Sequence, residues 1–100
     1  MARSPTAAQP TILLVDDDRA VLSAIAFALA TDGLDVAGFA NAEAALAARP
    51  RQVACVIVDE KLPGLSGLDL VDSLRRDGVA APAILITTAP SAALRRRARR

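Results

Sequence analysis

The chain has 100 residues, of which 53% are hydrophobic and 2% are aromatic. This length and composition suit one small domain with an aliphatic core, and they argue against recognition of single-stranded nucleic acid by aromatic stacking. The formal net charge of +1 hides an asymmetry, because five arginines fall in the last six residues. Residues 1–94 carry 7 basic and 11 acidic groups, a net charge of −4, so the body of the domain is acidic.

No apolar run approaches the roughly 18 residues of a membrane span, and the N-terminus lacks the charged-then-apolar layout of a signal peptide. The single cysteine, Cys55, lies in an apolar run and cannot form an internal disulfide, which suits a reducing compartment. We therefore expect a cytoplasmic protein.

The first ten residues are rich in Ala, Ser, Thr and Pro without periodicity, which predicts a disordered leader. The apolar run at residues 11–15 predicts a buried strand that ends in three acids, Asp16, Asp17 and Asp18. Read alone, such an acidic turn is more often a helix cap than a metal site.

Apolar residues then recur at helical spacing from residue 19 to 31, with Asp17 or Asp18 as N-cap and Gly33 as the C-terminal stop. Residues 35–39 form a short, weak strand pattern. This first part of the chain therefore reads as strand, acidic turn, helix and strand.

Asn41 is predicted to cap an alanine-rich helix from residue 42 to about 48, which ends before Pro50. The unbroken apolar run at residues 53–58 then predicts a buried central strand that delivers Asp59 to its C-terminal end.

Ser66 and Asp69 form a start similar to a capping box for a helix that stops at Gly78. Residues 82–87 predict a fourth strand, and Pro90 opens a last helical pattern. Strands that alternate with helices predict an α/β fold with a doubly wound parallel sheet.

Polar residues end three of the predicted strands, at positions 16–18, at Asp59 and at positions 87–88, and these ends should converge on one edge of the sheet. Carboxylates gathered in a dry cleft would take up protons unless a hard cation such as Mg²⁺ lay among them. An aspartate beside Mg²⁺ can accept a phosphoryl group. The hydroxyl of Thr87 could then bond the phosphoryl oxygens and move the loop that follows.

From Thr11 to its end, the chain resembles the receiver domains of two-component response regulators. The matching pieces are Ile12-Leu13-Leu14-Val15-Asp16-Asp17-Asp18, Val58-Asp59 with Leu62-Pro63-Gly64 and Gly67, and Ile84-Leu85-Ile86-Thr87-Thr88-Ala89. The resemblance implies a flavodoxin-like sheet of strand order 2-1-3-4-5.

It also implies that Asp59 accepts phosphate from a histidine kinase or phosphotransfer protein by self-catalysed transfer, so the chain would not be a turnover enzyme. Asp59 and Asp17 would ligate Mg²⁺ directly, Asp16 would act through water, and Lys61 would contribute its backbone carbonyl. Thr87 would be the switch hydroxyl.

Family members continue into a fifth strand that ends in a lysine and into a fifth helix, whereas the only lysine here is Lys61. We therefore expect a receiver-like domain over residues 11–100 that is incomplete at its C-terminus and exposes an apolar edge at residues 83–86. Such a chain would either self-associate through this edge or be a portion of a longer protein whose continuation supplies a strand ending in lysine.

Two other functions remain open. A phosphotransferase similar to the haloacid dehalogenases would have a second aspartate two positions after Asp59, where this chain has Lys61. A degenerate receiver would act as an unphosphorylated adaptor through protein contacts. The arginine-rich end reads as the solvated face of a helix rather than as a patch for nucleic acid or an acidic partner, so nucleic acid is not an expected partner of this domain alone.

Overall fold

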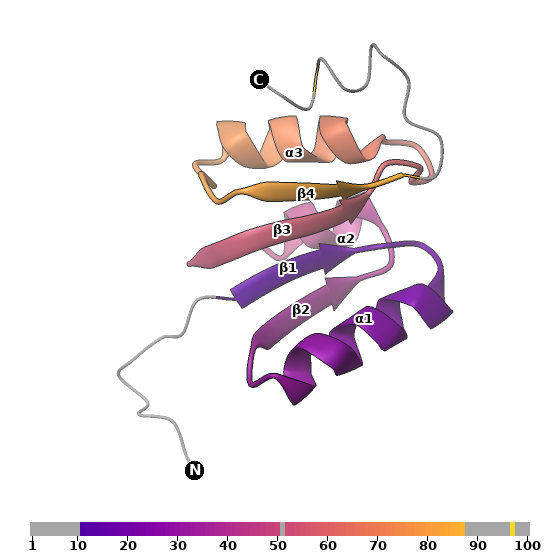
Figure 1. Cartoon of the computed structure of the whole chain (residues 1–100). Helices are drawn as coiled ribbons and strands as arrows, with labels where there is room; N and C mark the ends of the chain where they lie inside the picture. The colour runs from indigo at the N-terminus through magenta and orange to yellow at the C-terminus, as the bar shows by residue number, and fades with distance from the viewer. Residues whose placement is uncertain (1–10, 51, 88–96, 98–100) are drawn as a thin grey trace.

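In the part of the chain that the structure describes, four short apolar runs form one parallel sheet (Figure 1). The computed structural model describes residues 11–50, 52–87 and 97. The strands are β1 (Thr11–Val15), β2 (Asp35–Phe39), β3 (Val53–Asp59) and β4 (Ala83–Ile86). Their order is β2-β1-β3-β4, and all neighbouring pairs are parallel. The predicted doubly wound α/β fold is confirmed, with the strand order that the resemblance implied for these four strands.

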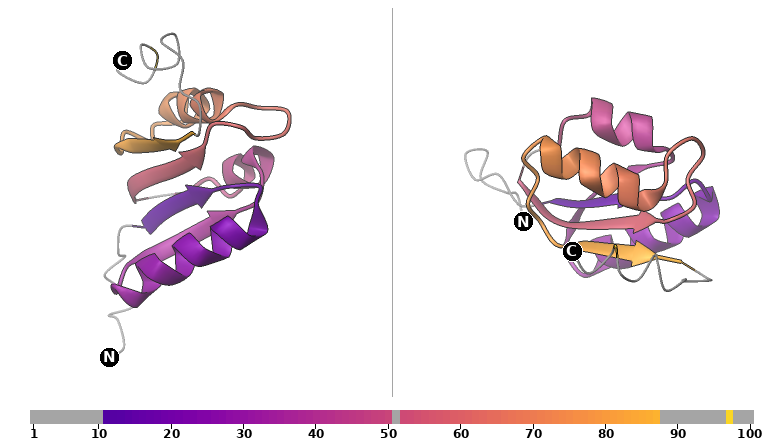
Figure 2. Two further views of the ribbon diagram at one scale, coloured as in Figure 1. Left: turned by 45° about the vertical axis from the view of Figure 1, so that its right-hand side comes forward. Right: turned by 90° about the horizontal axis from the view of Figure 1, so that it is seen from above.

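Three capped helices connect the strands: α1 (Arg19–Thr31), α2 (Ala42–Ala47) and α3 (Gly67–Arg76). The predicted caps are confirmed, because the side chains of Asp18, Asn41 and Ser66 each accept a backbone N–H from the first turn of their helix. The helix α1 lies on one face of the sheet, and α2 and α3 lie on the other (Figure 2).

The main core lies between the sheet and the two helices α2 and α3. Side chains that point to this face from the two central strands pack against small and branched residues of the helices. The fully buried members are Leu13, Val15, Val56, Val58, Ala42, Ala45, Leu70 and Leu74. Burial of each leucine contributes roughly 2 kcal/mol, so this face holds the sheet in register.

The opposite face is less covered, so β3, predicted to be a buried strand, has fully buried side chains on one face only. Leu14 of β1 is buried there, but Cys55 and Ile57 of β3 are half-buried and Ile84 of β4 is 53% exposed. The reason is that α1 contacts β2 and β1, and no other helix of the described residues lies on this face. An apolar run cannot reveal which of its two faces is covered.

Several expectations lie outside the described residues, namely the leader, the helical pattern after Pro90, and the positions of Thr88 and Ala89. Within residues 11–50, 52–87 and 97, no helix is long and apolar enough to span a bilayer.

Candidate phosphoryl-acceptor and metal site

Polar side chains follow three of the four strands at the edge where the parallel strands end. Asp16 comes directly after β1, Asp59 is the last residue of β3, and Thr87 follows β4. The register of β3 with both neighbours places these ends side by side. They line one pocket of about 230 Å³, which is formed by Asp16, Asp18, Val21, Asp59, Lys61, Ile86 and Thr87.

Three carboxylates meet at this edge. Asp16, Asp17 and Asp59 each place a carboxylate oxygen within 4.8 Å of the other two. Asp16 is buried, Asp59 is half-buried and Asp17 is exposed, so the cluster is open to solvent on one side. Three convergent oxygen donors of this kind match a small hard cation with oxygen ligands, such as Mg²⁺.

The environment of Asp16 explains why a cation would be favourable. Its Oδ1 accepts the backbone N–H of Asp18 at 2.9 Å, which favours the charged form. Burial nevertheless raises the pKa of the Asp16 carboxyl above its ordinary value, and the negative charges of Asp59, Asp17 and Asp18 raise it further. A bound cation would oppose both effects.

Asp18 serves the helix rather than the cluster. Its Oδ1 accepts the backbone N–H groups of Ala20 at 3.0 Å and Val21 at 3.2 Å, which caps α1. Of the two capping candidates in the sequence, the structure therefore selects Asp18 and leaves Asp17 beside Asp59.

The loop that joins β3 to α3 follows Asp59. The backbone N–H of Lys61 donates to Asp59 Oδ1 at 3.2 Å and so orients the Asp59 carboxylate. In this loop Gly64 has a φ of +76°, a backbone conformation that favours glycine. Gly67 is packed so closely that a Cβ there would lie 2.5 Å from the carbonyl oxygen of Asp59.

Sequence reasoning missed Glu60. Its carboxylate Oε1 accepts the backbone N–H of Leu68 at 3.0 Å, across eight positions of the chain. The available signal was an acid directly after Asp59 and shortly before a helix start, where negative charge is favourable.

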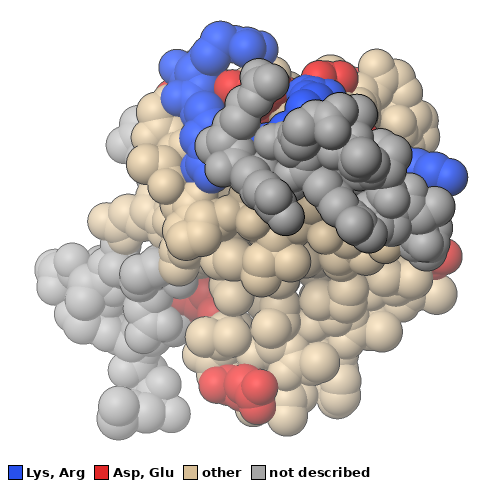
Figure 3. Space-filling view, turned by 45° about the horizontal axis from the view of Figure 1, so that its top comes forward, with Lys and Arg blue, Asp and Glu red and all other residues tan. Residues whose placement is uncertain are grey.

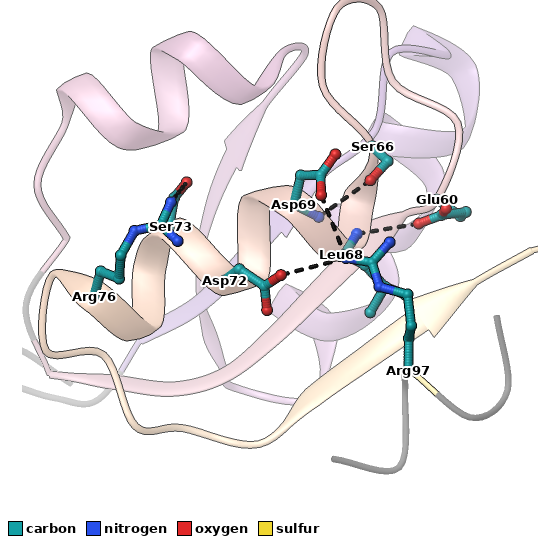
Figure 4. A network of polar contacts seen from close by, with 8 residues as sticks. All are labelled: Glu60, Ser66, Leu68, Asp69, Asp72, Ser73, Arg76 and Arg97. Carbon is teal, nitrogen blue, oxygen red and sulfur yellow. Dashed lines mark hydrogen bonds and ion pairs between the residues drawn. The ribbon is translucent and has the colours of Figure 1, made fainter. Parts of the chain in front are cut away.

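A second cluster of polar side chains lies at α3. Arg97 donates to Asp69 Oδ1 and to Asp72 Oδ2, both at 3.3 Å (Figure 4). Hydrogen bonds with Ser66 and, to a smaller extent, with Arg97 lower the pKa of the Asp69 carboxyl. Acidic and basic side chains lie next to one another on this side of the molecule (Figure 3). All three partners are more than 40% exposed, so salt weakens the contact.

Comparison with known proteins places this geometry in context. A sequence model of the response regulator receiver domain matches residues 12–100. The transcriptional regulatory protein FixJ of Azorhizobium caulinodans is 37% identical over 74% of this chain and 36% of its own length. The probable transcriptional regulatory protein TcrX of Mycobacterium tuberculosis is 35% identical over 77% of this chain and 33% of its own length. The chain thus spans about a third of these relatives.

Solved structures share the fold. The chemotaxis protein CheY4 of Vibrio cholerae superposes with a TM-score of 0.81 at 23% identity, over 92% of this chain and 79% of that one. A receiver domain protein similar to CheY from Methanospirillum hungatei gives a TM-score of 0.81 at 26% identity, over 90% of this chain and 73% of that one.

Proposed function

Because the chain belongs to the response regulator receiver family of two-component signalling, we propose that Asp59 accepts a phosphoryl group from a histidine kinase or phosphotransfer protein. The observation that carries this proposal is the convergence of Asp16, Asp17 and Asp59 within 4.8 Å at the end of the central strand. This is the charge pattern that an aspartyl-phosphate site with a divalent cation requires.

The carboxylates of Asp17 and Asp59, the backbone carbonyl of Lys61 and, through water, Asp16 would hold Mg²⁺. The ion would neutralise the negative charge that gathers on the phosphoryl oxygens as the group is transferred. An oxygen of Asp59 attacks phosphorus, the bond between phosphorus and the donor's imidazole nitrogen breaks, and the imidazole leaves. The chain thus promotes its own modification and does not turn over substrate.

Thr87 is the proposed switch hydroxyl. It is half-buried and lines the same pocket as Asp59. A phosphoryl group on Asp59 offers three acceptor oxygens, and a bond from the threonine hydroxyl would draw the segment after β4 toward the site.

Mass spectrometry of the intact protein tests the proposal. After incubation with acetyl phosphate and Mg²⁺, the wild-type chain is expected to gain the mass of one phosphoryl group, and the Asp59→Asn variant is expected to gain none. Asp32→Asn, which removes an exposed carboxylate at the other end of the sheet, serves as the control and should be labelled normally. Equal labelling of wild type and Asp59→Asn would exclude Asp59 as the phosphoryl acceptor. A wild-type chain that is not labelled and does not bind Mg²⁺ would favour the adaptor function.

We also propose that β4 pairs with a second copy of the chain. Among the described strands, β4 pairs with β3 alone, and Ile84 is 53% exposed. Sedimentation across a concentration series is expected to show association of wild type and a monomer for Ile84→Lys. Phe27→Lys, at a residue of α1 that is 75% exposed, should still associate. A wild type that stays monomeric with protected amides along β4 would rule this pairing out.

A further inference from the structure

Glu60 joins three elements of the fold through three hydrogen bonds. Its backbone N–H donates to the carbonyl oxygen of Ile86, the last residue of β4, at 3.0 Å. Its carbonyl oxygen accepts the N–H of Gly67 at 2.9 Å. Its carboxylate accepts the N–H of Leu68 at 3.0 Å (Figure 4). The residue directly after the acceptor aspartate therefore holds both β4 and the start of α3.

Together, Glu60 and Ser66 satisfy the first amides of α3. A helix leaves its first N–H groups without partners inside the helix. Here Gly67 and Leu68 donate to Glu60, and Asp69 donates to Ser66 Oγ at 3.1 Å. The carboxylate is also favourable beside the positive end of the helix dipole. The side chain of Glu60, directly before the loop of residues 61–66, thus binds the start of α3, directly after that loop.

This loop carries the groups that face the acceptor. The backbone N–H of Lys61 holds Asp59 Oδ1 at 3.2 Å, and Lys61 lines the pocket with Asp59 and Asp16. If the loop opened at α3, the path of residues 61–66 would be free to change, and the backbone of Lys61 would move relative to the acceptor carboxylate.

We propose that Glu60 is a positioning residue: its contact with Leu68 fixes the loop of residues 61–66 against α3 and thereby holds Asp59 and Lys61 in the geometry that binds metal and phosphate. The part that concerns metal and phosphate rests on the proposed function. The part that concerns the loop stands on the hydrogen bonds alone.

Two variants of Glu60 separate the hydrogen bond from packing. Glu60→Gln keeps an oxygen acceptor at the position of Oε1, whereas Glu60→Met keeps the length of the side chain and removes the acceptor. Amide hydrogen exchange without metal is expected to be roughly tenfold faster at Lys61 and Leu68 in Glu60→Met, and the affinity for Mg²⁺ is expected to be roughly tenfold lower. Glu60→Gln, which loses only the charge, should change much less than Glu60→Met in both measurements, and the distant charge control Asp32→Asn should match wild type.

The two measurements assign any failure. Unchanged exchange at Lys61 and Leu68 in Glu60→Met would overturn the proposal, as would faster exchange with unchanged Mg²⁺ affinity, because the contact would then serve only the stability of α3. Wild-type protein that binds no Mg²⁺ and takes no phosphoryl group would overturn the proposed function instead, and exchange at Lys61 would then decide on its own whether Glu60 holds the loop.

Discussion

The Gly67→Ala substitution is expected to destabilise the domain by about 3 kcal/mol, although alanine normally favours a helix. A Cβ at this position would lie 2.5 Å from the carbonyl oxygen of Asp59 and 2.9 Å from the Cα of Glu60. Both atoms belong to the backbone, so no side chain can rotate away to make room. Either α3 moves off the end of β3, or the backbone around Asp59 shifts.

Urea denaturation followed by circular dichroism measures this effect. Gly78→Ala is the matched control, because Gly78 follows the other end of α3. It has a φ of +94°, and no heavy atom lies within 4 Å of the position that an alanine Cβ would occupy. Its expected loss is only about 1 kcal/mol, which arises from the backbone conformation. Similar losses for the two variants would show that the short contact at Gly67 is relieved at little cost.

The sequence predicted the elements of this fold well because their signals are local. Asp18, Asn41 and Ser66 each cap the helix that directly follows them, and a short polar side chain before an apolar periodic run is sufficient to locate such a cap. The acids at the strand ends were equally visible, since the parallel order of the strands brings Asp16 and Asp59 to one edge.

Contacts between distant positions were not visible. The bond from Leu68 to Glu60 depends on how the loop of residues 61–66 folds back, and the pairing of Arg97 with Asp69 spans 28 positions. The half-coverage of β3 also escaped prediction, because Cys55 and Ile57 are as apolar as Val56 and Val58 on the covered face. Residue type shows what a side chain tolerates, whereas coverage depends on which helix lies above it.

The buried carboxylate of Asp16 is expected to lower stability and to favour metal binding, and the Asp16→Asn substitution is expected to separate these two effects. The pKa of Asp16 is raised above its ordinary value of 3.8. At pH values between the ordinary pKa and the raised pKa, the folded protein holds a proton that the unfolded chain has released, so stability falls as pH rises through this interval. Above the raised pKa the penalty is complete, and removing the carboxylate should then stabilise the metal-free protein by on the order of 1 kcal/mol.

Mg²⁺ is expected to reverse this order. Ligand at 100 times its dissociation constant stabilises a folded protein by about 2.7 kcal/mol, and wild type should gain this amount while Asp16→Asn gains little. We therefore expect the variant to be more stable than wild type without the ion and less stable with it, and thermal unfolding at neutral pH, with and without Mg²⁺, measures both differences. The amide oxygen of the variant can still accept the N–H of Asp18, so the start of α1 is preserved.

Asp18→Ala, which removes the cap of α1, is the control and should instead lose about 1 kcal/mol under both conditions. An Asp16→Asn variant less stable than wild type without metal would mean that the stronger bond from the Asp18 N–H to a charged acceptor outweighs burial and repulsion at Asp16.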